Sequence, residues 1–239
     1  MSPVRAVFLD AGNTIFTERV SRSVIYAEVA NGHGGQADEA EAADHMGRTF
    51  AELPSSLEGN FRYSLAWFRA FNQRVLTELG VPAGRLTDAH LALLARFEDP
   101  ATYTLFPEVP AVLEELSNRG LTVGVVSNWS ERLPVLLTGM GVAGQLEFIV
   151  TSAEMRAEKP ERAIFERALF RAGVPPEEAL HVGDHLERDV RGALGAGLRA
   201  ALVDRADGAP TAAPEGVPVL EDLRGILALV EQTSHASRA

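Results

Sequence analysis

Short apolar runs alternate with helical patterns along most of the chain. Runs rich in β-branched residues, each followed by a helical pattern of ten or more residues, are typical of parallel βαβ units. We expect strands at Val4–Asp10, Leu121–Ser127, Phe148–Thr151, Ala179–Gly183 and Arg199–Val203. The expected helices are Glu108–Arg119, Ser130–Gly139, Pro160–Ala172, Glu187–Gly195 and Glu221–Gln232. The pattern therefore predicts an α/β fold with a Rossmann-like parallel sheet as its core.

One long interval after the first strand has helical patterning and no strand pattern. Its strongest helix is Asn60–Leu79, with apolar residues at three- and four-residue spacings. A crossover between parallel strands needs only a dozen or so residues, so this interval favours an inserted all-helical cap domain. The alternative is a pair of crossover helices that have grown long. We expect residues 16–97 to form the helical cap, and residues 1–15 and 98–239 to form the α/β core.

Composition narrows the class of protein. The chain has 239 residues, 33 acidic and 22 basic, for a net charge of −11. A chain this acidic lacks the basic surface that binds nucleic acid or an anionic membrane. The absence of Cys excludes thiolate metal sites and Cys nucleophiles. No apolar stretch approaches membrane-spanning length, and Asp10 interrupts the first apolar run. We therefore expect a cytoplasmic globular protein, with an irregular loop at Ala206–Gly216 and a disordered tail at Ser234–Ala239.

Polar residues follow three of the expected strands directly. Asp10 ends the first strand, Ser127 and Asn128 end the second, and Asp184 follows the fourth. Lys159, the only Lys in the chain, precedes an expected helix. Ligands of open parallel sheets bind outside the carboxyl ends of the strands, so these side chains are expected to gather there. Carboxylates suit a hard divalent cation, and a hydroxyl and an ammonium suit a phosphate.

Each of these residues also has a purely structural interpretation. Asp10 can simply end a strand, and Ser127 can be the N-cap of the helix expected from Ser130. Asp184 and Asp189 can stabilise the start of the next helix through its dipole. Lys159 can be a solvated side chain. The order and common location of the set favour a functional site.

The arrangement of these residues resembles the haloacid dehalogenase-like (HAD) hydrolase superfamily, in the branch with a helical cap inserted after the first motif. The resemblance covers nearly the whole chain and is strongest to the HDHD3-like subgroup. Four motifs carry it, in the order of the family: Asp10-Ala11-Gly12-Asn13-Thr14, Ser127-Asn128, Lys159-Pro160 and Gly183-Asp184-His185-Leu186-Glu187-Arg188-Asp189.

The resemblance implies a role for each matching residue. Asp10 would be the nucleophile that forms an aspartyl-phosphate, and Lys159 would offset the charge that gathers there. Ser127 and Asn128 would bind the phosphoryl oxygens. Mg²⁺ would be the cofactor, held by Asp10, the backbone carbonyl of Gly12, Asp184 and Asp189. These roles imply a phosphatase that acts on a small phosphorylated compound.

One position departs from the family pattern. Phosphatases of this superfamily usually carry a second Asp two residues after the nucleophile, as general acid and base, and this chain has Gly12 there. Loss of such a group typically costs about 10²–10⁴ in rate. The substrate then has a good leaving group, or another side chain replaces the Asp, or the protein binds without turnover. The candidate replacements are Glu18, His33 and His185.

Two further interpretations fit the same residues. A non-catalytic phosphate-binding or interaction protein would explain Gly12. A haloacid dehalogenase also lacks the second Asp, but the retained Asp184 and Asp189 favour a metal and hence phosphorus chemistry. Trp67 is expected in the packing of the cap, and Trp129 either lines the site or packs beside it.

Overall fold

The computed structural model describes residues 2–205 and 212–236. The chain divides into two compact units. The first comprises Met1–Thr17, Leu105–Asn128 and Met140–Ala239, and the second comprises Glu18–Thr104 and Trp129–Gly139. The divisions at 17/18 and 104/105 lie two and seven residues after those expected from the sequence, and residues 129–139 group with the second unit.

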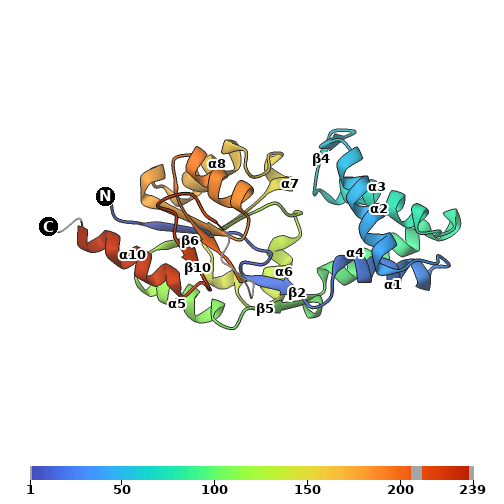
Figure 1. The fold of residues 1–239 in the computed structure, drawn as a ribbon, viewed down its shortest axis with the longest axis horizontal. Coiled ribbons are helices and arrows are strands. Elements are labelled where there is room, and N and C mark those ends of the chain that lie inside the picture. The colour runs from blue at the N-terminus through green and yellow to red at the C-terminus, as the bar shows by residue number, and fades with distance from the viewer. Residues whose placement is uncertain (1, 206–211, 237–239) are drawn as a thin grey trace. The chain divides into compact units, whose positions relative to one another are not determined.

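The first unit is built on a six-stranded parallel sheet in the order β10-β9-β8-β1-β6-β7 (Figure 1). All five strands expected from the sequence are present. The short edge strand β10 was not expected, because two residues give no periodic pattern. The strands are β1 (Ala6–Leu9), β6 (Thr122–Ser127), β7 (Phe148–Thr151), β8 (Ala179–Gly183), β9 (Arg199–Val203) and β10 (Val219–Leu220).

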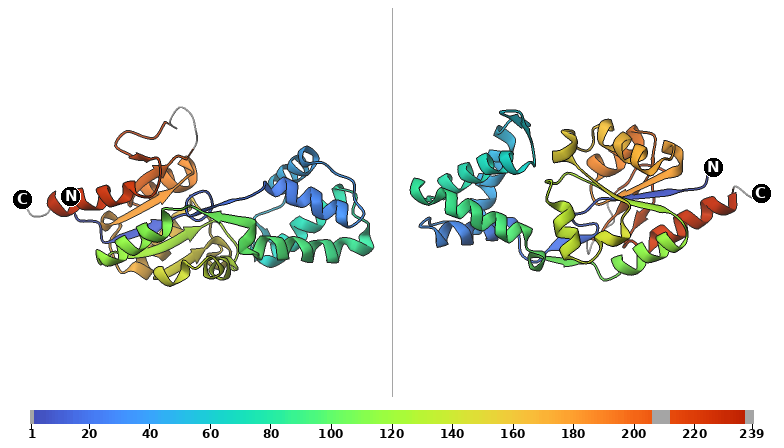
Figure 2. Two further views of the ribbon diagram at one scale, coloured as in Figure 1. Left: turned by 90° about the horizontal axis from the view of Figure 1, so that it is seen from below. Right: turned by 180° about the vertical axis from the view of Figure 1, so that it is seen from behind.

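Helices cover both faces of this sheet. Helix α8 (Arg162–Ala172) lies on one face, and α5 (Val109–Asn118) and α10 (Gly225–Ala236) lie on the other (Figures 1 and 2). Phe8 of β1 and Phe165 of α8 are buried in one apolar cluster between the sheet and this helix. The remaining elements are α7 (Ser152–Met155), η3 (Ala143–Gln145), η4 (Pro176–Glu178), the π-helical turn η5 (Leu186–Arg191) and α9 (Gly192–Gly195).

Some expected boundaries of the first unit are corrected by the structure. The helix expected at 187–195 begins as a π-helical turn and becomes α-helical only at Gly192. The last helix begins at Gly225 and continues to Ala236, so the first three residues of the expected disordered tail are helical. Residues 237–239 of that tail, and residues 206–211 of the expected irregular loop, lie outside the described residues.

Between its ends, the second unit is helical apart from a short hairpin. Its core packs Trp67, which is fully buried, against Phe71 at 5.4 Å between ring centroids, as expected for a packing role. The hairpin of β3 (Ser56–Leu57) and β4 (Asn60–Phe61) corrects the all-helical expectation. Because β4 occupies Asn60 and Phe61, the strongest helix begins at Leu65 rather than at Asn60. The helices are α1 (Arg22–Gly32), α2 (Glu39–Glu52), α3 (Leu65–Glu78), η1 (Ala83–Arg85), α4 (Leu86–Glu98), η2 (Pro100–Thr102) and α6 (Leu133–Gly139).

Two further strands, β2 (Phe16–Glu18) and β5 (Tyr103–Leu105), pair where the chain leaves and re-enters the first unit. They are three residues long and were not expected. Within the described part of the chain, no helix combines the length and apolarity needed to span a bilayer.

Candidate active site

The candidate site lies at the carboxyl end of β1, which is flanked in the sheet by β6 and β8. Asp10 follows β1 directly, Ser127 is the last residue of β6, and Asp184 follows β8. Neighbouring parallel strands end at one edge of a sheet, so residues far apart in the sequence meet here. The topology alone therefore explains why these three positions are neighbours.

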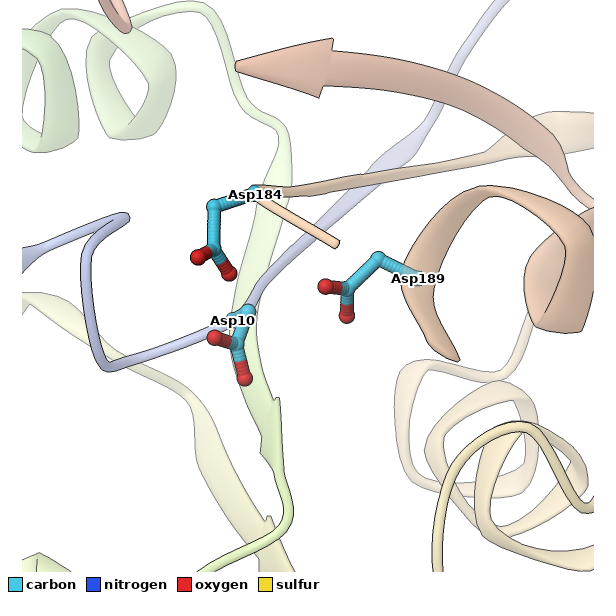
Figure 3. Close-up of side chains that lie close together, drawn as sticks. All are labelled: Asp10, Asp184 and Asp189. Atoms are coloured by element: carbon cyan, nitrogen blue, oxygen red, sulfur yellow. The ribbon is translucent and has the colours of Figure 1, made fainter. Parts of the chain in front are cut away.

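Three carboxylates face one another at this edge (Figure 3). Asp10, Asp184 and Asp189 each offer an oxygen atom, and these atoms lie within 4.8 Å of one another. Carboxylate oxygens at this spacing are a donor set of the kind that hard divalent cations prefer. The residues present therefore fit a divalent cation such as Mg²⁺.

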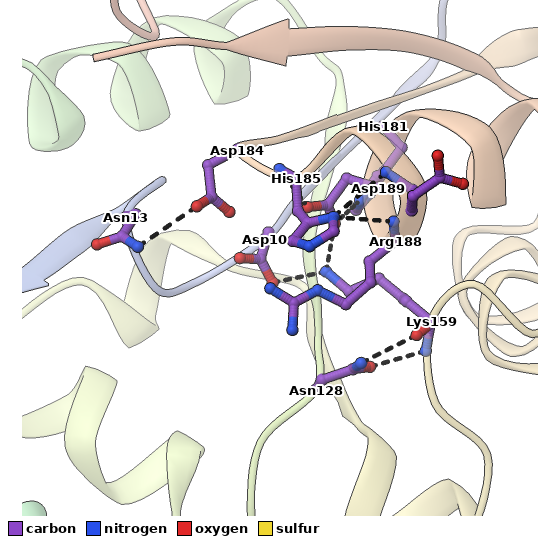
Figure 4. Close-up of polar contacts among 10 residues, drawn as sticks. Asp10, Asn13, Asn128, Lys159, His181, Asp184, His185, Arg188 and Asp189 are labelled. Carbon is purple, nitrogen blue, oxygen red and sulfur yellow. Dashed lines mark hydrogen bonds and ion pairs between the residues drawn. The ribbon is translucent and has the colours of Figure 1, made fainter. Parts of the chain in front are cut away.

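Lys159 lies inside this group of acids. Its Nζ donates to Oδ1 of Asp10 at 2.6 Å and to Oδ1 of Asp189 at 2.5 Å (Figure 4). Only 3% of Lys159 is exposed, so the interpretation as a solvated side chain is wrong. Burial lowers the pKa of Lys159, but Asp10 and then Asp189 outweigh it and raise the pKa above the usual value. Lys159 is thus a buried ammonium held between two carboxylates.

Asn128 fixes the backbone of Lys159. The amide of its side chain donates to the carbonyl of Lys159 at 3.0 Å, and its Oδ1 accepts the N–H of Lys159 at 2.7 Å (Figure 4). This two-way bond joins the end of β6 to the segment before α8. The side chain of Asn128 therefore positions Lys159, a contact that the sequence did not reveal.

Asp189 accepts three hydrogen bonds. Its Oδ1 receives Lys159 and Nε2 of His181, and its Oδ2 receives the backbone N–H of His185 at 3.0 Å. Burial alone would raise the pKa of Asp189, but Lys159 and then the bond from His181 hold it well below the usual value. A Cβ on Gly183 would lie 2.3 Å from the carboxyl carbon of Asp189, so only Gly leaves room for this carboxylate.

His181 is a buried partner that the sequence analysis missed. It lies on β8, is fully buried, and its Nε2 is 3.0 Å from Oδ1 of Asp189. Burial lowers the pKa of His181, so the ring is neutral and Nε2 carries the proton that it donates. The ring of Phe165 packs edge-on against it at 5.2 Å. A polar residue in an otherwise apolar strand was the available signal.

Asp184 has a different environment from Asp189. Burial and the negative charges of Asp10 and Asp189 raise the pKa of Asp184 to about 6. The side-chain amide of Asn13 donates to Oδ2 of Asp184 at 3.3 Å (Figure 4). Asn13 adopts a left-handed backbone with φ of 54° in the turn after Gly12. Asp10 and Asp189 are bonded to the ammonium of Lys159, whereas Asp184 is bonded to a neutral amide. The negative charge of Asp184 is therefore the least compensated in the cluster.

The structural interpretation of Ser127 is wrong, whereas that of Asp189 describes only part of its contacts. Helix α6 begins at Leu133, so Ser127 is too far away to be its N-cap. The N-cap of η5 is His185, whose Nδ1 accepts the N–H groups of Glu187 and Arg188 at 3.2 and 3.3 Å. Asp189 does lie in the first turn of η5, but it is also buried and accepts a bond from Lys159, which an isolated helix start would not require.

A family model independently matches residues 4–197, described as haloacid dehalogenase-like hydrolase. The chain belongs to the haloacid dehalogenase-like hydrolase family. It is 33% identical over 215 residues to haloacid dehalogenase-like hydrolase domain-containing protein 3 of Danio rerio, which covers 87% of this chain and 88% of that protein. It is 38% identical over 165 residues to a phosphoserine phosphatase of Thermus thermophilus, which covers 67% and 66% of the two chains. The HAD-like assignment and the subgroup expected from the motifs are confirmed.

Solved structures agree with the HAD-like fold. A HAD phosphatase from Thermococcus onnurineus aligns with a TM-score of 0.69 at 23% identity, over 95% of this chain and 98% of that one. A 2-haloacid dehalogenase from Pseudomonas syringae aligns with a TM-score of 0.71 at 23% identity, over 96% and 99%. Phosphatases and dehalogenases share the fold, so the chemistry is decided by the side chains.

Proposed function

We propose that this HAD-like hydrolase is a Mg²⁺-dependent phosphatase that acts on small phosphorylated compounds through an aspartyl-phosphate on Asp10. The observation that carries the proposal is the cluster of Asp10, Asp184 and Asp189 around Lys159. A haloacid dehalogenase displaces halide from carbon and needs no metal, so the presence of both Asp184 and Asp189 beside Asp10 favours attack on phosphorus. The phosphatase names of two relatives, one acting on phosphoserine and one on glyceraldehyde 3-phosphate, support the same chemistry.

Asp10, Asp184 and Asp189, with the backbone carbonyl of Gly12, would hold the Mg²⁺, which supplies positive charge to the phosphoryl oxygens. Asp10 attacks phosphorus in line and the leaving oxygen departs with the P–O electron pair. Lys159 neutralises charge on Asp10 and on the transferring group, and Ser127 and the N–H of Asn128 bind phosphoryl oxygens. Water then releases phosphate and restores Asp10.

Gly12 limits which substrates can react. Of the candidate replacements, Glu18 is paired with Arg22 at 2.5 Å and Nδ1 of His33 lies 2.7 Å from the carbonyl of Val29. Nδ1 of His185 caps η5. Each therefore already has a structural partner. We infer that the leaving group departs without a dedicated acid, which favours acyl and aryl phosphates over alkyl phosphates.

We further propose that residues 16–97 are the cap domain of the family and carry side chains that select the substrate, while residues 1–15 and 98–239 carry the chemistry. All the proposed catalytic and metal residues lie in the first unit.

The test is hydrolysis of a series of phosphates graded by leaving-group pKa, from acetyl and nitrophenyl phosphate to sugar phosphates. We expect release from the first two to require both Mg²⁺ and Asp10, with Asp10→Asn as control. Alkyl phosphates should react at least about 100-fold more slowly, because they need the missing acid. Halide release from 2-haloacids without a metal, or no turnover of any phosphate, contradicts the proposal.

A further inference from the structure

Arg205 joins three segments at the carboxyl end of the sheet. It follows β9, and its guanidinium reaches the turn between β1 and β2 and the segment between β5 and α5. Nη2 donates to the carbonyl of Thr14 at 2.9 Å and to Oε1 of Glu108 at 2.6 Å. The guanidinium carbon lies 3.5 Å from the ring centroid of Phe106. All of these residues belong to the first unit.

The ion pair of Arg205 and Glu108 is largely shielded from water. The side chains are 17% and 9% exposed. Glu108 is the residue before α5, yet its side chain makes no cap bond and turns to Arg205 and the N–H of Leu223 instead. Partly buried charge pairs with two or more partners hold their geometry better than exposed pairs.

The Thr14 carbonyl belongs to the turn that carries the first motif. Three successive N–H groups, those of Thr14, Ile15 and Phe16, converge on the carbonyl of Ala11. Asn13, in the left-handed region, donates to Asp184 from the middle of this turn. Thr14 is fully buried, so its carbonyl would have little access to water if Arg205 were removed.

The segment around Phe106 is bonded to the same turn. The N–H of Phe106 donates to the carbonyl of Ile15 at 3.1 Å, next to the bond from Arg205 to Thr14. Arg205 therefore links Phe106 and Glu108 to the turn. It contacts the ring of Phe106, pairs with Glu108 and donates to the carbonyl of Thr14.

We propose that Arg205 is a positioning residue for the reaction. It fixes the turn at residues 11–16, and through that turn it fixes Gly12 and the Asn13 amide beside Asp10 and Asp184. Arg205 touches neither substrate nor the proposed metal ligands. The inference deepens the proposed phosphatase function and depends on it for its kinetic consequences.

Lys cannot replace Arg205 in this role. The planar guanidinium stacks on Phe106 while it bonds to Thr14 and Glu108, whereas an ammonium is a compact charge without a face to stack. The charge-preserving variant Arg205→Lys therefore separates the loss of geometry from the loss of charge. Arg162, in an exposed ion pair with Glu166 on α8, offers a matched control as Arg162→Gln.

The experiment compares the full chain with Arg205→Ala, Arg205→Lys and Arg162→Gln. With Mg²⁺ and acetyl phosphate, kcat should fall by about tenfold to 100-fold in both Arg205 variants, with little change in KM, because a reacting group held slightly out of place slows chemistry. Free guanidinium at a non-denaturing concentration should restore part of the kcat of Arg205→Ala, and sodium at equal ionic strength should not. Arg162→Gln should match the wild-type protein.

Hydrogen exchange gives a second readout that needs no turnover. Amides in the peptide spanning residues 11–17 should exchange at least about tenfold faster in Arg205→Ala, while those of α8 keep the wild-type rate. If wild-type protein hydrolyses no phosphate but this local change occurs, the phosphatase proposal fails, and only the part of the inference in which Arg205 fixes the turn at residues 11–16 stands. Unchanged exchange at 11–17, wild-type kcat in both variants, or an equal acceleration across the first unit overturns the proposal for Arg205.

Discussion

Two carboxylates in the same cluster have opposite electrostatic environments. Asp189 accepts three donors, among them the ammonium of Lys159, and its pKa is lowered. Asp184 has the Asn13 amide and two negative neighbours, and its pKa is raised to about 6. Asp189 is thus bound to the protein's own cation, whereas the charge that needs an external cation is at Asp184.

The first prediction concerns the metal-free protein and Asp184. The folded-state pKa of about 6 lies above the ordinary value of 3.8, so ionisation of Asp184 destabilises the fold. Its contribution to stability is present below pH 3.8 and is lost as the pH rises through about 6. Two pKa units correspond to at most about 3 kcal/mol, and partial exposure reduces this to about 1 kcal/mol.

Asp184→Asn should therefore stabilise the protein in EDTA at pH 8 and have little effect at pH 4, as measured by urea denaturation. Asp222→Asn is the comparison, because the pKa of Asp222 is lowered by its bond to Arg224 and its substitution should destabilise at pH 8. A loss of stability at pH 8 in Asp184→Asn would refute the electrostatic strain assigned to this cluster.

The second prediction uses Lys159 as a spectroscopic probe. Because it is the only Lys in the chain, protein labelled with ¹⁵N-lysine gives a single side-chain ammonium signal. The pKa read from this signal should lie above 10.5, since the two carboxylates outweigh burial. In Asp189→Asn one of them is removed, so the pKa should fall. An unchanged value in that variant would mean that Asp189 does not hold the ammonium in solution.

The sequence indicated which residues meet at the site but not how they are held. Asp10, Ser127 and Asp184 follow apolar runs, and the parallel topology brings such positions to one edge. No pattern in the sequence indicates that Asn128 bonds to the Lys159 backbone or that His181 bonds to Asp189. They depend on the distance between segments that only the folded chain defines.

At the scale of elements, long buried strands were predictable and short edge elements were not. The strand β6 carries six apolar or small residues in a row, whereas β10 has two residues and is held by its pairing with β9. The π-helical turn η5 has the composition of an ordinary helix. Its widened turn places Asp189 over Gly183, a tertiary requirement that local propensity does not encode.

The third prediction tests that close approach. Gly183→Ala should push away the Asp189 carboxylate or the strand, with a cost of about 1–3 kcal/mol in stability. Because Lys159 is bonded to Asp189, kcat should fall by about 100-fold. Gly195→Ala is the control, since nothing lies within 4 Å of its added carbon and it is helical. Equal kcat in the two variants would show that the position of Asp189 is not limiting.

At the scale of the molecule, each unit has an apolar cluster of its own among the described residues. One cluster joins the sheet to α8 and α9, and the other packs the helices of the second unit together, with Leu57 of the hairpin against it. The acidic cluster and Lys159 belong to the first unit only. Stability of the two cores should therefore respond to different perturbations.

The fourth prediction is that the units unfold in two separable transitions. Trp67→Ala removes the largest fully buried side chain of the second core and should cost about 3–5 kcal/mol there. Mg²⁺ should instead raise the transition of the first unit by mass action, in wild type and in Trp67→Ala alike. Calorimetry with hydrogen exchange assigns each transition to its unit. A single transition that both perturbations shift together would mean that the cores unfold as one cooperative body, because coupled cores share every gain and loss of free energy.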